Sequence, residues 1–280
     1  MNPEPLTIRK MKPDDLALAL DWAAAEGWNP GLSDADSFFA ADPDGFFLAE
    51  ANGEPVGCVS AVAYDGGFGF LGLYIVRPQS RGRGFGLRLW NTAMDYLGAR
   101  NVGLDGVVAQ QENYKKSGFA IAGRNIRQQG VGGGGDPGGL TDLREIGLDA
   151  QARYDESVFP APRRAFLSRW IAQPGATALA WLNGDALAGY GVLRPCRSGF
   201  KIGPLFADDP EIADALFRSL VARAPGAPVF LDTPENNPAA ISLARRHGLA
   251  PAFETARMYT GAAPAIRPES CYGVTTFELG

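Results

Sequence analysis

The chain has 280 residues, 46 % of them hydrophobic, and a formal net charge of −5 at pH 7. This length suits two domains of about 140 residues, each with enough apolar residues for its own core. The sequence holds no run of about 18 apolar residues, so we expect no membrane span. Its acidic balance without basic clusters argues against nucleic acid as the main partner.

Cysteine and histidine usage narrows the class of protein further. Cys58, Cys196 and Cys271 lie far apart and form no C-x-x-C pair, which is typical of a reduced cytoplasmic protein. Residues 1–5 have neither a basic region nor an apolar stretch, so we expect no signal peptide. Because His247 is the single histidine, we expect neither a histidine-based metal site nor a Ser-His-Asp triad, and no metal cofactor.

The elements of the first half can be predicted in chain order. Residues 12–15 place a proline and two acids at a helix start, and the apolar stripe that follows ends at Gly27. Two strands are expected around a turn at Asn52-Gly53, because that dipeptide favours hairpins. The predicted elements after the first helix are strands 46–51, 55–64 and 68–76, a helix at 85–99 and a strand near 102–108.

The segment between strand 68–76 and helix 85–99 carries the most informative chemistry. A turn at Pro78 leads into the sequence Arg-Gly-Arg-Gly-Phe-Gly at 81–86. A strand, a glycine-rich turn and a helix N-terminus form an anion site, because the first helical N–H groups point at the ligand. Arg81 and Arg83 add permanent charge that suits phosphate oxygens.

Several known phosphate loops can be compared with this segment. A dinucleotide fold needs G-x-G-x-x-G directly after the strand, and a Walker loop needs Gly-Lys-Ser/Thr, and neither is present. A glycine-rich turn without function is the plainest alternative, which the flanking strand and amphipathic helix weaken. The segment closely resembles motif A of the Gcn5-related N-acetyltransferases (GNAT), whose pattern Arg/Gln-x-x-Gly-x-Gly/Ala fits Arg81, Gly84 and Gly86.

The resemblance implies acetyl-CoA as the co-substrate, with its pyrophosphate held by the glycine loop. It further implies that the backbone N–H of Val76 donates a hydrogen bond to the thioester oxygen, at the place where the central strand separates from its neighbour. The cofactor-binding residues expected on this basis are Ile75, Val76, Arg81, Gly82, Arg83, Gly84, Phe85, Gly86, Gln110 and Asn113.

Residues 113–119, Asn-Tyr-Lys-Lys-Ser-Gly-Phe, resemble motif B of the same family, in which the tyrosine points at the thioester sulfur. A phenol is protonated at neutral pH and can give its proton to the departing thiolate, so Tyr114 is the expected general acid. A tyrosine that only packs its ring against a core is the alternative. The family usually has an asparagine seven residues earlier, where this chain has Val107; Gln110 and Gln111 are candidates to replace it.

The glycine-rich segment 128–139 is the predicted boundary between two domains, 1–132 and 140–280, because it can hardly hold a regular element. Whether it is a flexible hinge or a surface turn is open. The second half repeats the plan of the first with a hairpin at 178–193, strands at 201–206 and 229–232, and helices at 212–220 and 236–247.

The second half departs from the family's pattern at both motifs. It keeps an asparagine at Asn237, but the tyrosine position is Ala244, and residues 207–211 carry three carboxylates in place of the glycine loop. Such a loop repels a pyrophosphate, so this lobe is expected to shape or cover the acceptor pocket without binding CoA. Segments that resemble the tandem YitH-like acetyltransferases are 27–31, 155–163, 194–199, 201–206, 231–236, 257–261 and 277–280.

The resemblance therefore implies an α/β (α+β) fold of two tandem GNAT lobes, with mixed central sheets flanked by helices and a degenerate C-terminal lobe. The general base must come from outside the central strand, or water must carry the proton away, since strand 68–76 contains no carboxylate. Asp232 and Glu235 are the preferred candidates, because they follow a strand's carboxyl end, where α/β ligand sites gather. The further candidates are Asp155 and Glu278, and any of the four can also be an ordinary salt-bridge residue.

For the acceptor site we expect Trp28, Tyr74 and Asp155, although Trp28 is equally suited to packing. The expected function is transfer of an acetyl or other short acyl group from CoA to a primary amine, on a small molecule, by direct attack in a ternary complex. The alternatives are an acyl-CoA sensor without turnover and an acetyltransferase acting on protein lysines or N-termini. The sequence leaves open whether the protein forms a homodimer.

Overall fold

The computed structural model describes residues 5–280. Its first half forms β1 (Leu6–Lys10), α1 (Pro13–Ala25), α2 (Asp34–Ala41), β2 (Phe46–Ala51), β3 (Glu54–Ala63), β4 (Phe68–Val76), α3 (Phe85–Leu97), β5 (Asn101–Val107), α4 (Gln111–Lys116) and β6 (Ala120–Val131). The second half forms β7 (Thr141–Asp142), α5 (Leu148–Asp155), α6 (Arg164–Ile171), β8 (Thr177–Asn183), β9 (Ala186–Pro195), β10 (Phe200–Ala207), α7 (Pro210–Val221), β11 (Pro228–Pro234), α8 (Pro238–Arg246), β12 (Ala250–Tyr259) and β13 (Cys271–Gly273).

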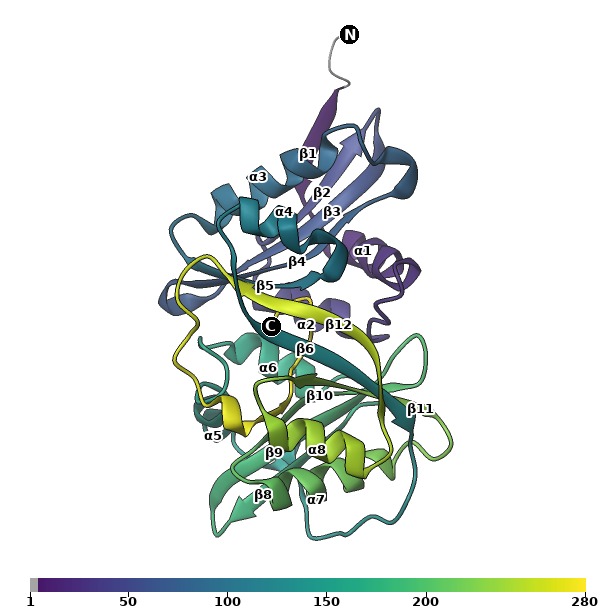
Figure 1. The fold of residues 1–280 in the computed structure, drawn as a ribbon, viewed down its shortest axis with the longest axis vertical. Coiled ribbons are helices and arrows are strands. Elements are labelled where there is room, and N and C mark those ends of the chain that lie inside the picture. Colours follow the sequence, from purple (N-terminus) through teal and green to yellow (C-terminus); the bar gives the residue numbers. More distant parts are fainter. Residues whose placement is uncertain (1–4) are drawn as a thin grey trace.

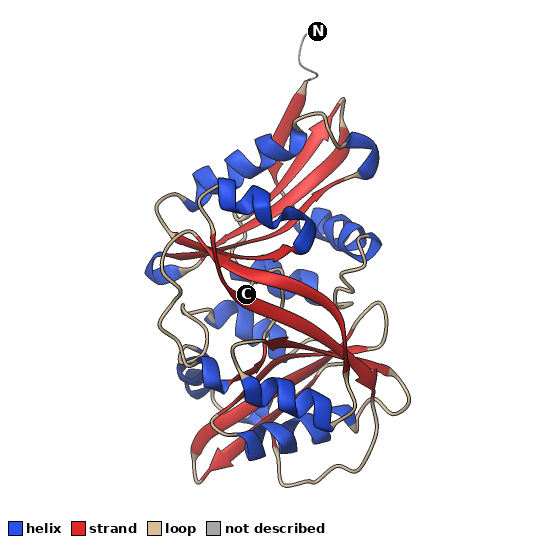
Figure 2. Ribbon diagram, in the orientation of Figure 1, coloured by secondary structure: helices blue, strands red, loops and turns tan. Residues whose placement is uncertain are grey.

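One mixed sheet runs through residues 5–280 in the order β1-β2-β3-β4-β5-β12-β6-β11-β10-β9-β8-β7, with β13 paired to β10. Only the β4–β5 and β10–β11 pairs are parallel among the strand pairs of this described part. Helices flank both faces (Figure 2). The predicted α/β class with mixed sheets and flanking helices is confirmed, and the sheets of the two lobes are joined edge to edge.

The junction is made by two exchanged strands that cross the middle of the molecule (Figure 1). β12, from the second half of the chain, pairs with β5, and β6, from the first half, pairs with β11. β12 and β6 also pair with each other along most of their length. We call β1–β5 with β12 and α1–α4 the N lobe, and the remaining strands and helices the C lobe. The proposed domain limits 1–132 and 140–280 stay a prediction, and the exchange crosses them.

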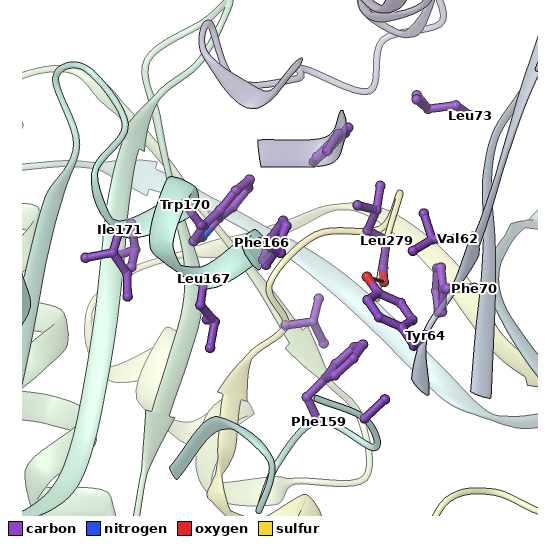
Figure 3. Packing of buried hydrophobic residues seen from close by; sticks show 14 of the residues in the cluster. Val62, Tyr64, Phe70, Leu73, Phe159, Phe166, Leu167, Trp170, Ile171 and Leu279 are labelled. Carbon is purple, nitrogen blue, oxygen red and sulfur yellow. Dashed lines mark hydrogen bonds between the residues drawn. The ribbon is translucent and has the colours of Figure 1, made fainter. Parts of the chain in front are cut away.

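A buried hydrophobic cluster rich in aromatic rings contains residues from both halves of the chain (Figure 3). The ring of Phe38 on α2 stacks on Trp170 of α6, with centroids 6.2 Å apart. Tyr64 packs edge-on against Phe159, at 5.1 Å, and its hydroxyl donates to the Leu279 carbonyl at 3.0 Å. Since these residues are buried, the lobes are expected to unfold as one unit.

Local sequence signals account for most elements of the first half. β4 spans 68–76 as predicted, and α3 begins at Phe85 and ends before Gly98, whose φ is 59°. The turn between β2 and β3 has positive φ at both Asn52 and Gly53, as a type I′ hairpin requires. One prediction was wrong: segment 128–139 is not free of regular structure, since β6 continues to Val131, where pairing with β11 outweighs the glycine content.

None of the helices in residues 5–280 combines the length and the apolar character needed to cross a membrane.

The parallel strands β10 and β11 of the C lobe separate after Ile202 and Leu231. The chain's own β13 fills the gap: it pairs with β10, and the next residue, Val274, donates its N–H to the Asp232 carbonyl of β11 at 2.9 Å. A Cβ at Gly273 would lie 2.5 Å from the Leu231 side chain, so the inserted strand is tightly held.

The segment that follows β13 runs from this gap to the N lobe, between the two halves of the molecule (Figure 1). Two glycines let it approach the sheet closely. A Cβ at Gly203 on β10 would lie 2.4 Å from the Thr275 carbonyl oxygen, and one at Gly72 on β4 would lie 2.0 Å from the Glu278 carbonyl oxygen. Backbone packs on backbone at both places, which a side chain would prevent.

Gly72→Ala should therefore destabilise the fold by about 1–3 kcal/mol, because overpacking must displace the segment around Glu278. The measurement is urea unfolding followed by tryptophan fluorescence. The matched control is Gly123→Ala on β6, where a Cβ meets no atom within 4 Å. Equal stability of the two variants would contradict the close approach.

Candidate active site

The N lobe has an opening between its two parallel strands. β4 and β5 pair from Phe68–Asn101 to Leu71–Leu104 and then separate. The register of β4 against β3 shifts just beyond this point, and Leu73 has a φ of 44°, in the left-handed region that non-glycine residues rarely occupy. This bulge bends β4 away from β5 and leaves a gap in the sheet.

The backbone beyond the bulge presents a free donor to the gap. Arg77 donates its N–H to the Val56 carbonyl of β3 at 2.9 Å, and Val76 lies opposite Gly57. Since hydrogen bonding alternates along an antiparallel pair, the Val76 N–H points away from β3, toward the side that β5 has left. The resemblance to the GNAT family implies Val76 as the donor to the thioester oxygen, and this role stays a prediction.

A cavity of about 480 Å³ occupies the gap. The first half of the chain lines it with β4, the end of β5 and α4, and the second half adds Phe253 and Thr255 of β12 together with Phe277 and Glu278. Predicted site residues found in its lining are Trp28, Tyr74, Ile75, Val76, Arg81, Gln110, Tyr114 and Glu278.

Tyr114 reaches the cavity from α4. Its ring stacks on Trp90, with centroids 5.5 Å apart, and packs over Gly106, where a Cβ would lie 2.9 Å from the ring. The hydroxyl makes no hydrogen bond within residues 5–280, so it is free to meet a ligand. Burial, with a smaller contribution from Tyr74, raises the pKa of Tyr114 above its usual value, which keeps the phenol protonated at neutral pH.

The glycine loop lies at the N-terminus of α3. Gly82 and Gly84 have φ values of 76° and 79°, and a Cβ at either would face open space. The first helical bond of α3 runs from the Arg88 N–H to the Gly84 carbonyl at 3.3 Å, so the N–H groups of 85–87 have no helical partner. These groups and the helix dipole make an anion site of the expected kind.

Arg81 connects this loop to the edge of the cavity. Its Nε donates to the Val76 carbonyl at 2.8 Å, and its Nη2 donates to Glu26, at the end of α1, at 2.5 Å. Asn113 donates to the Gln110 side chain at 2.9 Å but does not itself line the cavity. The loop residues 82–86 adjoin the cavity without lining it.

The structure separates the four carboxylates that the sequence offered as bases. Asp232 is buried and pairs with Arg127 through two hydrogen bonds of 2.7 and 2.8 Å. Asp155 is buried beside Arg163, at 2.7 and 2.8 Å, and accepts a hydrogen bond from the Tyr190 hydroxyl. Glu235 is exposed and pairs with Arg124. None of these three lines the cavity, whereas Glu278 does.

Glu278 is buried, and its carboxylate accepts a hydrogen bond from the Thr276 hydroxyl. Its charge reaches a cluster of buried cations behind the cavity. Burial acts to lower the pKa of Arg127 and Arg194, but Asp232 and Asp34 respectively outweigh it and raise the pKa of each, and Glu278 adds a smaller contribution. Lys201 belongs to the same cluster, and burial is the main reason that its pKa is lowered. Sequence reasoning missed Lys201, Phe253 and Phe277; residues 277–280 were quoted only for their likeness to tandem acetyltransferases.

The decisive comparison is with a curated relative. The "Holothin acyltransferase" of Pseudoalteromonas sp. (strain SANK 73390) is 34 % identical over 263 residues, which cover 93 % of this chain and 90 % of the relative. Residues 15–119 match the family described as "Acetyltransferase (GNAT) family", and residues 152–273 match "Acetyltransferase (GNAT) domain". The chain belongs to the GNAT family. It is an acyltransferase of this family, which normally uses acetyl-CoA. The likeness to a curated acyltransferase disfavours the alternative of an acyl-CoA sensor without turnover.

Solved structures support the tandem architecture. A putative acetyltransferase from Pyrococcus horikoshii, 23 % identical, matches all of this chain and 97 % of its own with a TM-score of 0.85. A tandem GNAT protein from the clavulanic acid biosynthesis pathway, 14 % identical, matches 92 % of this chain and all of its own with a TM-score of 0.62. At these identities the likeness shows the fold alone.

The second GNAT lobe lacks the open gap in the sheet and the uncapped helix N-terminus that the first lobe has. Its equivalent gap holds β13, and the N-terminus of α7 is already capped: the Asp209 carboxylate accepts the N–H groups of Glu211 and Ile212, each at 2.9 Å. This arrangement supports the expectation that the C lobe does not bind CoA. Within residues 5–280, no group of three or more His, Cys, Asp or Glu side chains is placed to hold a metal ion.

Asp232→Asn should destabilise the protein by about 3–5 kcal/mol at pH 7, because Arg127 would remain buried without its counter-charge. Burial acts to raise the pKa of Asp232, but Arg127 outweighs it and holds the pKa below the usual value. Because the pKa of Asp232 is lower in the folded state, its ionised form stabilises the fold fully at pH values above the unfolded pKa of about 3.9. This contribution is lost as the pH falls from there through the folded-state pKa. Urea unfolding at pH 7 and at acid pH measures the shrinking difference between variant and parent.

The control for this prediction is Glu235→Gln, since an exposed ion pair adds little stability. If Asp232→Asn unfolds no more easily than Glu235→Gln, the buried pair does not have the structural role assigned to it.

Proposed function

We propose that this protein transfers an acetyl group from acetyl-CoA to a primary amine on a small molecule, by direct attack in a ternary complex. The observation that carries the proposal is the cavity between β4 and β5, which Val76, Tyr114 and Glu278 line together. The glycine loop and the N-terminus of α3 adjoin it.

Acetyl-CoA fits the residues on this side of the N lobe. The N–H groups at the start of α3 suit the pyrophosphate, since they are donors at the positive end of a helix dipole. The open edge of β4 beyond Leu71 offers backbone groups to the cofactor's amide-containing arm, as a strand edge does for an extended peptide. Gln110 reaches the same gap from the turn before α4 and can serve where Val107 replaces the usual asparagine.

The transfer step then needs three contributions from this chain. The amine nitrogen attacks the thioester carbonyl, and the Val76 N–H donates to the oxygen as negative charge develops on it. Tyr114 donates its proton to the departing thiolate, a role that its raised pKa supports because the phenol remains the protonated species. Glu278, directly or through water, takes the proton that the amine nitrogen loses.

A small-molecule acceptor is favoured over a protein. The cavity volume of about 480 Å³ falls in the range of small-molecule sites. Residues from both halves of the chain surround it, which leaves less access than an open peptide groove would need. The curated relative is named for acyl transfer to holothin, which adds weight to a small acceptor here.

Gly84→Val tests the cofactor site. A β-branched side chain is strained at the φ of 79° and would stand before the N–H groups that face the pyrophosphate. Calorimetry with CoA should show an affinity at least about tenfold lower, a loss of about 1.4 kcal/mol. The control is Asp209→Ala at the corresponding C-lobe helix, which should keep full affinity. Undiminished CoA binding by a folded Gly84→Val protein would overturn the loop assignment.

Tyr114→Phe and Glu278→Gln test the chemical step. Each removes one proton-transfer group while the ring packing on Trp90, or the side-chain volume, is kept. We expect each to lower kcat by about 10²-fold, the usual contribution of general acid–base catalysis, with CoA affinity little changed. A thiol-release assay and calorimetry on the same samples separate the two effects. An unchanged kcat would remove that residue from the mechanism.

A further inference from the structure

Three aromatic side chains from separate segments line the part of the cavity that is enclosed by β12 and by the segment after β13. They are Trp28 in the loop after α1, Phe253 on β12 and Phe277. The rings of Phe253 and Phe277 have centroids 6.3 Å apart. Trp28 and Phe277 are partly buried and Phe253 is exposed, so each ring keeps some surface that a ligand can contact.

A buried ion pair holds this aromatic wall in place from behind. The Arg127 guanidinium lies 4.9 Å from the Phe277 ring centroid and 5.8 Å from that of Phe253, and it donates to the Trp28 carbonyl at 2.8 Å. Asp232 fixes the guanidinium through two hydrogen bonds. A wall whose support is fixed in this way is preorganised, which lowers the entropy cost of stacking a ligand on it.

The charges in the cavity limit what the acceptor can carry. Of its carboxylates, Glu26 pairs with Arg81, and Asp105 pairs with Arg257 at 2.7 and 3.0 Å. Glu278 is the carboxylate of this lining that forms no direct ion pair within residues 5–280. Arg127, Arg194 and Lys201 act on its charge from behind the cavity, so it can anchor at most one ammonium group. A polyamine would bring further charges that find no partner.

Four uncharged polar side chains line the cavity, and the proposed mechanism already uses the Tyr114 hydroxyl, which leaves Tyr74, Gln110 and Thr255. The Thr255 hydroxyl faces Asp105, and the Gln110 amide oxygen accepts from Asn113. An amino sugar would therefore bury hydroxyl groups without hydrogen bonds, which costs free energy for each group. The geometry points to an acceptor in which one primary amine is carried on a flat, apolar aromatic or heteroaromatic ring, with the ring against Trp28 and Phe277 and the amine toward Glu278. This inference rests on the proposed function.

A thiol-release assay with acetyl-CoA tests it, using tryptamine and 2-phenylethylamine against 2-cyclohexylethylamine, spermidine and glucosamine. We expect kcat/KM for the two aromatic amines to exceed that for spermidine and glucosamine at least about tenfold. Bound spermidine or glucosamine would bury several amine or hydroxyl groups without partners, whereas the aromatic amines would not. 2-Cyclohexylethylamine has the same chain and a similar volume without an aromatic face, so it isolates the stacking contribution.

Phe277→Leu should raise KM for tryptamine about three- to tenfold, the value of one aromatic contact, and change KM for 2-cyclohexylethylamine much less. Phe200→Leu, the same substitution on β10 outside the cavity lining, should change neither. Faster release with spermidine or glucosamine, or equal KM effects on the two ring amines, would overturn the aromatic acceptor and leave the proposed function standing. Absence of thiol release with every amine would overturn both.

Discussion

The hydrogen bonding of β12 between β5 and β6 is the constraint on which the rest of the structure depends. It closes the edge that β5 would otherwise expose and brings a strand from residues 250–259 into the sheet of the N lobe. Because Phe253 and Thr255 lie on that strand, the first half of the chain cannot complete the cavity alone. The exchange therefore ties the folding of the second lobe to the chemistry of the first.

The segment after β13 makes the same connection a second time. It begins in the gap of the C lobe and ends beside β4, where Gly72 accommodates the Glu278 carbonyl oxygen. A carboxylate that β4 itself lacks is thus supplied to the cavity by residues more than two hundred positions away in the chain. In the proposed mechanism, the degenerate lobe covers the site and delivers this group, and it binds no second cofactor.

The sequence predicted what local patterns determine and missed what distant pairing determines. β4, the glycine loop and α3 follow one another closely, and period and turn chemistry are sufficient to place them. Tyr114 was singled out by its likeness to motif B of the GNAT family. Asp232 was a candidate base because it lies at a strand's carboxyl end. Its partner, Arg127, is 105 residues away, so nothing in the sequence pattern revealed that the two are paired. Lys201 and Phe277 are placed near the cavity by packing against segments distant in the chain. Periodicity and composition do not predict such contacts.

The two GNAT lobes differ in what occupies the sheet gap and the helix N-terminus of each. Each contains a pair of parallel strands that diverge, since both inherit the same sheet topology. In the N lobe the gap is left open and a bare helix N-terminus adjoins it, whereas in the C lobe β13 fills the gap and Asp209 caps the helix. Hydrogen bonds that a ligand would satisfy in one lobe are satisfied by the chain itself in the other. Function here is therefore decided by which backbone donors remain unpaired, and the fold alone does not specify it.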